Sequence, residues 1–129
     1  MSEDLKIKQE RTAHHEPGHV VIAAVQGLRL RPEGIMVAPS GWGLGCYHKE
    51  SDGSDLSRKR IVLATFAGYF DEKRFCDERS YEISDPESWY INNDDGREAR
   101  TLLSEMSPEN LSGGSLSATY LELLEIVLT

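Results

Sequence analysis

The chain has 129 residues, a length that fits one domain with a single continuous core. Its 39% hydrophobic and 28% charged residues are typical of a chain that folds, and its formal net charge of -8 disfavours binding to nucleic acid. The apolar stretches are too short to span a membrane and residues 1–11 do not form a secretory signal, so we expect a cytoplasmic protein.

The first predicted element is a helix that carries two histidines. Small and apolar residues from about Thr12 to Val25 predict a largely buried helix that ends at Gly27, and residues 1–11 before it are a candidate flexible segment. The helix contains the sequence His-Glu-Pro-Gly-His at residues 15–19. Its proline would cost roughly 3 kcal/mol inside a helix, a cost that vanishes if the helix begins near His14.

A hairpin and a second helix follow. Residues 34–47 contain two short β-compatible runs on either side of a Pro-Ser-Gly turn, which predicts a small β-hairpin. A break at residues 52–54 precedes apolar residues that recur at helical spacing from Leu56 to about Phe75. This spacing predicts a second, longer helix.

The last part of the chain is predicted to be mostly loop and short helices. Residues 76–91 are polar, and we expect a surface loop with a one-turn helix opened by the capping pattern at residues 84–87. A third helix is indicated around Ala99 to Met106, and residues 107–115 form a linker to a C-terminal helix over Leu116 to Val127. The prediction is one mainly α domain over residues 1–129 with a small β-hairpin, an α+β fold.

The two histidines of the first helix form a candidate metal site. Residues four apart in a helix point the same way, so His15 and His19 can share one ion. Zinc held by neutral imidazoles lowers the pKa of bound water towards 7, and Glu16 beside them would act as general base. The competing interpretation is a solvated helix face, but the small and apolar neighbours favour a buried helix whose histidines need partners.

A third ligand has to come from elsewhere, because a catalytic zinc usually has three protein ligands. Asp94, Asp95, Glu72 and Glu98 are the candidates. Asp95 also opens a capping-box pattern with Glu98. The spacing alone therefore supports two roles for Asp95 equally, helix cap and metal ligand.

The other residues that could bind a metal are given simpler roles. His14 lies about 100° around the helix from His15, so we expect a surface or supporting position, and His48 is expected to be exposed. Cys46 and Cys76 are two cysteines 30 residues apart, for which we expect two reduced thiols.

Four separated segments point, in order, to one family. Residues 12–19 are similar to a Thr-Ala-x-His-Glu-Ala-Gly-His segment, and residues 35–46 match its following strand pair through Pro-x-Gly-x-x-Leu-Gly. Residues 67–72 and 94–99 match two later segments more loosely, Gly-Gly-Arg-Ala-Ala-Glu and Asn-Asp-x-x-x-Ala. With these segments the chain resembles the peptidase domain of the FtsH-type ATP-dependent zinc metalloproteases.

The resemblance implies a compact, helical, zincin-like metallopeptidase domain. It implies zinc as the cofactor, with His15, His19 and Asp95 as ligands and Glu16 as the catalytic residue. It also implies a polypeptide substrate, whose extended backbone would pair with the strand near residues 35–38. Asp94 replaces the family's asparagine, which keeps Asp94 open as the ligand instead.

The sequence also departs from full-length family members. It contains no phosphate-binding loop, so we expect hydrolysis of unfolded or flexible segments without an ATPase of its own. A separate ATPase and a homo-oligomer both stay open as partners. The alternative functions are a catalytically degenerate module that binds a peptide or protein partner, and a hydrolase for a small molecule or one dedicated protein.

Overall fold

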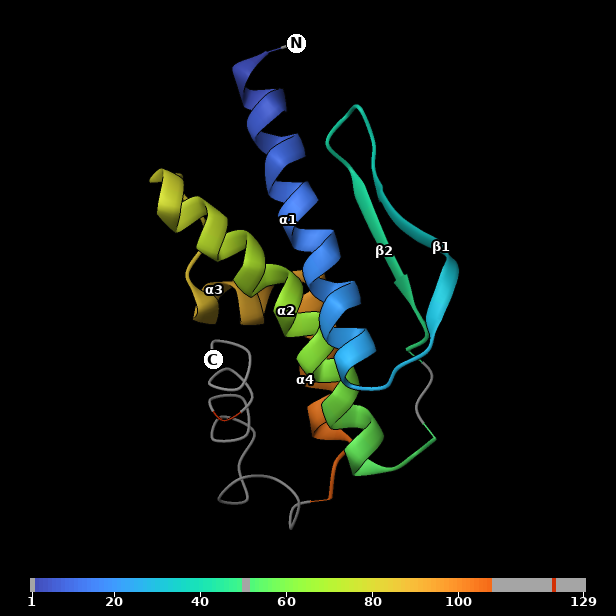
Figure 1. Cartoon of the computed structure of the whole chain (residues 1–129). Helices are drawn as coiled ribbons and strands as arrows, with labels where there is room; N and C mark the ends of the chain where they lie inside the picture. The colour runs from blue at the N-terminus through green and yellow to red at the C-terminus, as the bar shows by residue number, and fades with distance from the viewer. Residues whose placement is uncertain (1, 50–51, 108–121, 123–129) are drawn as a thin grey trace.

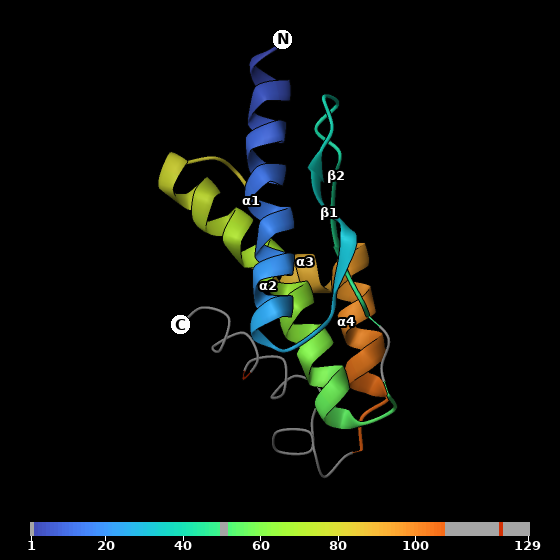
Figure 2. The same cartoon turned by 45° about the vertical axis from the view of Figure 1, so that its right-hand side comes forward.

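The computed structural model describes residues 2–49, 52–107 and 122. It is mainly helical, with four helices and one two-stranded sheet in the described residues, so the predicted α+β class is confirmed. The N-terminal part of helix α1 and the turn of the hairpin lie side by side and project beyond the other three helices (Figures 1 and 2). Apart from Glu122, the predicted C-terminal helix lies outside the described residues.

Helix α1 spans Glu3–Val25 and begins nine residues earlier than predicted. The Ser2 side chain caps it by accepting a hydrogen bond from the backbone N–H of Leu5, and two acids in the first turn suit the helix dipole. Residues 3–11 therefore belong to this helix. The early start also places Pro17 in the helix interior, so the condition under which its cost would vanish, a helix that begins near His14, is not met.

The hairpin forms as predicted, from β1 (Leu30–Val37) and β2 (Gly43–Tyr47). The two strands are antiparallel, with Met36 opposite Leu44 and Val37 opposite Gly43. The turn between them packs on α1, because the Thr12 hydroxyl donates to the carbonyl of Gly41. Gly41 has a φ of 86°, a conformation that suits glycine.

Helix α2 spans Asp55–Arg79 and supplies most of the core. Its buried apolar side chains pack against the two short helices α3 (Pro86–Asn92) and α4 (Asp94–Ser104). The Trp89 ring of α3 stacks on the Tyr69 ring of α2 with centroids 4.6 Å apart. The core cluster consists of Val62, Leu63, Phe66, Tyr69, Phe70, Trp89, Ala99, Leu103 and Met106.

The prediction of a mostly loop segment at residues 76–91 is wrong. α2 continues to Arg79 and α3 begins at Pro86, so only residues 80–85 connect the two helices. The cap of α3 is Asp85, whose carboxylate accepts from the backbone N–H of Ser88. The segment looked polar, but its Trp89 is 4% exposed and belongs to the core.

Two glycines allow α1 and α2 to cross at close range. A Cβ atom on Gly18 of α1 would lie 2.8 Å from the carbonyl oxygen of Ala67, and one on Gly68 of α2 would lie 2.4 Å from His19 Nε2. A side chain at Gly18 would press against the backbone of α2, and a side chain at Gly68 would overlap the His19 ring. The crossing is seen in both views, with α2 passing behind α1 (Figures 1 and 2).

Two further expectations can be compared with the structure. Both cysteines are free, as predicted, and both are buried. No helix in the described part of the chain has the length and apolar character needed to cross a membrane.

The tight contact at Gly68 predicts that Gly68→Ala destabilises the wild-type protein but stabilises a His19→Ala variant. Gly68→Ala should lower the free energy of unfolding by about 1 to 3 kcal/mol, because the methyl group overlaps the buried His19 ring. In a His19→Ala background the overlap is gone, and the same change should raise stability by about 1 kcal/mol through helix propensity. Urea denaturation of the four proteins measures this; equal effects in both backgrounds would contradict the contact.

Candidate metal centre

His15 and His19 lie one helical turn apart on α1, and their rings meet edge to face. The ring centroids are 4.7 Å apart, and the two Nε2 atoms are 3.0 Å apart. His19 is buried, and its ring fills the space left by the missing side chain of Gly68. The predicted pairing of these two side chains on one helix face is therefore present.

Asp95 reaches the same point from α4. Its Oδ2 lies 3.3 Å from His19 Nε2 and 3.5 Å from His15 Nε2. Asp95 is not the cap of α4, because the side chain of Asn93 accepts the backbone N–H of Asp95 and fills that role. The role of helix cap is thus excluded for Asp95, and its carboxylate faces the two histidines.

The other candidate ligands lie away from this point. The Asp94 side chain is 99% exposed and faces Arg97 at 3.8 Å. Glu98 pairs with Lys49 at 3.3 Å. Within the described residues, one group of three possible ligand atoms lies within 4.8 Å of one another, and its members are His15, His19 and Asp95.

The outer nitrogens of both histidines are held by acceptors from α2. His15 Nδ1 lies 2.7 Å from Glu72 Oε1, and His19 Nδ1 lies 2.8 Å from the carbonyl oxygen of Ala64. A carbonyl and a carboxylate only accept hydrogen bonds here, so both Nδ1 atoms carry a proton and donate it. A neutral imidazole in this state directs its Nε2 lone pair to the common point.

Glu16 lies beside this cluster, against β2. A Cβ atom on Gly43 would lie 2.8 Å from Glu16 Cγ, and one on Gly45 would lie 3.2 Å from Glu16 Oε2. The two glycines therefore leave the space that the Glu16 side chain uses. Among the described residues, no hydrogen bond to the Glu16 carboxylate is found.

The remaining histidines lie outside the cluster. The His14 ring is exposed to solvent and stacks on Phe75 with centroids 4.3 Å apart, which fits the expected surface position. His48 follows β2 and is half-buried, so the expectation that it is exposed is wrong.

Two neighbours of the cluster were not found from the sequence: Arg11, which contacts Glu72, and Tyr47, whose ring centroid is 6.3 Å from that of His19.

The cluster perturbs its own pKa values strongly. Burial by itself would lower the pKa of His15, but hydrogen bonds to Asp95 and Glu72 outweigh it and raise the pKa from 6.5 to about 9. Burial would raise the pKa of the Asp95 carboxyl, yet its bonds to His15 and His19 hold that pKa well below its ordinary range. Without a metal, His15 is therefore a cation at neutral pH.

The donor set fits a zinc ion. Two imidazole nitrogens and one carboxylate oxygen are donors that zinc accepts, and three protein ligands are typical of a catalytic site that keeps one position open. Hydrogen bonds from the outer nitrogens to a carboxylate and a carbonyl are also usual for zinc-bound histidines. A zinc ion would be held by His15, His19 and Asp95, in place of the proton that His15 carries in the metal-free protein.

The raised pKa of His15 predicts how the stability of the metal-free protein depends on pH. A group whose pKa is higher in the folded state stabilises the protein fully below its unfolded value of 6.5, and loses this effect as pH rises towards 9. The free energy of unfolding, measured with urea and a chelator present, should therefore fall between pH 6.5 and about 9. His15→Gln should flatten the curve in this range; an unchanged slope would contradict the assignment.

Comparisons of the chain with protein-family models, with curated proteins and with solved structures found no match. They therefore add no family or function to the geometry described above.

Proposed function

We propose that the chain is a zinc-dependent peptidase that hydrolyses peptide bonds in unfolded or flexible protein segments. The observation that carries the proposal is the meeting of three donor atoms, from His15 and His19 of α1 and from Asp95 of α4, within 3.0 to 3.5 Å of one another. These donors are 80 residues apart in sequence at their extremes. The resemblance of residues 12–19 and 35–46 to FtsH-type peptidases supports the same reading.

The proposed chemistry divides between the metal and Glu16. A zinc ion at this position supplies Lewis acidity, which favours ionisation of water and polarises a carbonyl group. Glu16 accepts the proton of the attacking water as the water oxygen bonds to the peptide carbonyl carbon. It then delivers this proton to the amide nitrogen as the C–N bond breaks, so the products are an amine and a carboxylic acid, which loses its own proton to solvent.

The position of β2 supports an extended polypeptide as substrate. Gly43 and Gly45 of β2 lie directly against Glu16, and β2 pairs with one strand only among the described residues. An extended segment could add to the other edge of β2 through backbone hydrogen bonds, which demand little of the substrate's sequence. The strand expected to receive the substrate was β1, at residues 35–38, but β2 is the strand that contacts Glu16.

Such a binding mode requires a substrate whose backbone is already accessible. A folded protein satisfies its backbone groups internally, so the segment has to be flexible or unfolded, or delivered by a separate ATPase. We propose that the chain acts on such segments and carries no unfolding activity itself.

The ligand assignment predicts a clear difference between two neighbouring aspartates. Wild type prepared without chelator should contain about one zinc per chain. Asp95→Ala or His19→Ala should lose this zinc, because each substitution removes one of the three proposed ligands. Asp94→Ala is the matched control and should keep zinc, since Asp94 is exposed and pairs with Arg97. Elemental analysis measures this; loss of zinc in Asp94→Ala alone would move the ligand by one residue.

The role of Glu16 predicts a variant that binds metal without cleaving. Glu16→Gln should keep zinc and lower the cleavage rate of unfolded casein by at least about a hundredfold, because the amide cannot accept the proton. Glu10→Gln, on the same helix, should cleave at the wild-type rate. Retained cleavage in Glu16→Gln would refute the assignment, and peptide binding without turnover in zinc-loaded wild type would favour the degenerate binding module.

A further inference from the structure

Arg11 holds the Glu72 carboxylate, which accepts a hydrogen bond from His15. Its Nε donates to Glu72 Oε2 at 2.7 Å, and its Nη2 lies 2.7 Å from the same oxygen. The other oxygen, Oε1, accepts the Nδ1 proton of His15 at 2.7 Å. The two oxygens of Glu72 are thus divided between Arg11 and His15, which lie one turn apart on α1.

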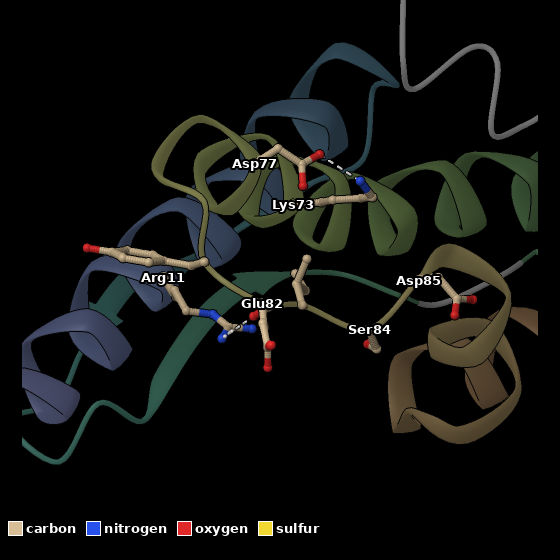
Figure 3. Close-up of a pocket in the computed structure, with 8 residues that line it drawn as sticks. Arg11, Lys73, Asp77, Glu82, Ser84 and Asp85 are labelled. Atoms are coloured by element: carbon tan, nitrogen blue, oxygen red, sulfur yellow. Dashed lines mark hydrogen bonds and ion pairs between the residues drawn. The ribbon is translucent and has the colours of Figure 1, made fainter.

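A third contact fixes the guanidinium itself. Arg11 Nη1 donates to the carbonyl oxygen of Glu82 at 3.3 Å, drawn as a dashed line in Figure 3. Glu82 belongs to the connection between α2 and α3, which borders an open hollow of about 690 Å³ that Arg11 and Lys73 also line. Arg11 therefore joins three parts of the chain at one point.

The planar guanidinium suits this task better than a simple positive charge. It presents several N–H groups in a fixed fork, so it can hold one Glu72 oxygen with two nitrogens while a third nitrogen contacts the connection. A glutamate without such a partner would sample several rotamers on the surface of α2. Glu72 Oε1 would then move out of hydrogen-bonding position for His15 Nδ1.

We propose that Arg11 is a positioning residue for the candidate metal centre, acting on His15 through Glu72. By holding Glu72, it fixes the rotation of the His15 ring and keeps Nε2 at the point where His19 Nε2 and Asp95 Oδ2 meet. The effect on zinc rests on the proposed function, whereas the link from Arg11 to His15 exists in the metal-free protein.

Zinc affinity gives the first test. Chelator competition should show that Arg11→Gln binds zinc about ten- to a hundredfold more weakly than wild type, the usual effect of losing support behind a metal-bound histidine. Arg11→Lys keeps the charge without the fork and should give an intermediate loss. Lys73→Gln is the matched control, since Lys73 lines the same hollow but pairs with Asp77, and its affinity should stay within about twofold of wild type.

A double substitution tests whether Arg11 acts through Glu72. In a Glu72→Gln background, Arg11→Gln should weaken zinc binding no further, because the carboxylate that it positions is already gone. An equal further loss in this background would overturn the proposal, as would a loss in Lys73→Gln as large as that in Arg11→Gln. Either result would mean that Arg11 acts as a general charge.

The metal-free protein separates this inference from the proposed function. In nitrogen-15 spectra recorded with chelator, the His15 Nδ1–H signal should exchange slowly with water in wild type and rapidly in Arg11→Gln. Wild type that binds no zinc would refute the peptidase proposal and leave this test intact. An unchanged Nδ1–H signal in Arg11→Gln would overturn the role of Arg11; if that variant does not fold, the same comparison is made with Arg11→Lys.

Discussion

The close crossing of α1 and α2 is the constraint on which the rest of the structure depends. Gly18 lets the backbone of α1 approach Ala67, and Gly68 opens the space that the buried His19 ring fills. At this separation the carbonyl of Ala64 reaches one histidine and the carboxylate of Glu72 reaches the other. One contact between two helices therefore orients both rings, without a residue from any loop.

The candidate site carries an excess of negative charge within a small volume. Glu16, Glu72 and Asp95 are three acids around two histidines, and among the described residues Arg11 alone adds a fixed positive charge in contact with one of them. In the metal-free protein this excess of negative charge favours a protonated His15, so the proton and a metal compete for the same Nε2. Metal affinity at such a site rises with pH, because binding displaces the proton.

The sequence predicted most of the helices and the hairpin, because their signals are local. The missed start of α1 had local signals too, a serine cap at Ser2 followed by acids, but the segment has little apolar periodicity to draw attention to it. The segment that holds Trp89 was misread as surface loop for a different reason. Its hydrophobic side chain faces Tyr69 of another helix, and this partner is 20 residues away in the sequence.

By itself the sequence determined the pairing of His15 with His19, because residues four apart on a helix share a face whatever surrounds them. It also placed Glu16 next to that pair and named Asp94, Asp95, Glu72 and Glu98 as candidate third ligands, among which only the family resemblance favoured Asp95. Only the tertiary structure showed where these acids lie: Asn93 caps α4 and frees Asp95 to face the histidines, while Glu72 lies behind His15 beside Arg11. These positions depend on how α1, α2 and α4 pack. The spacing of residues along the sequence does not predict the distance between side chains on separate helices.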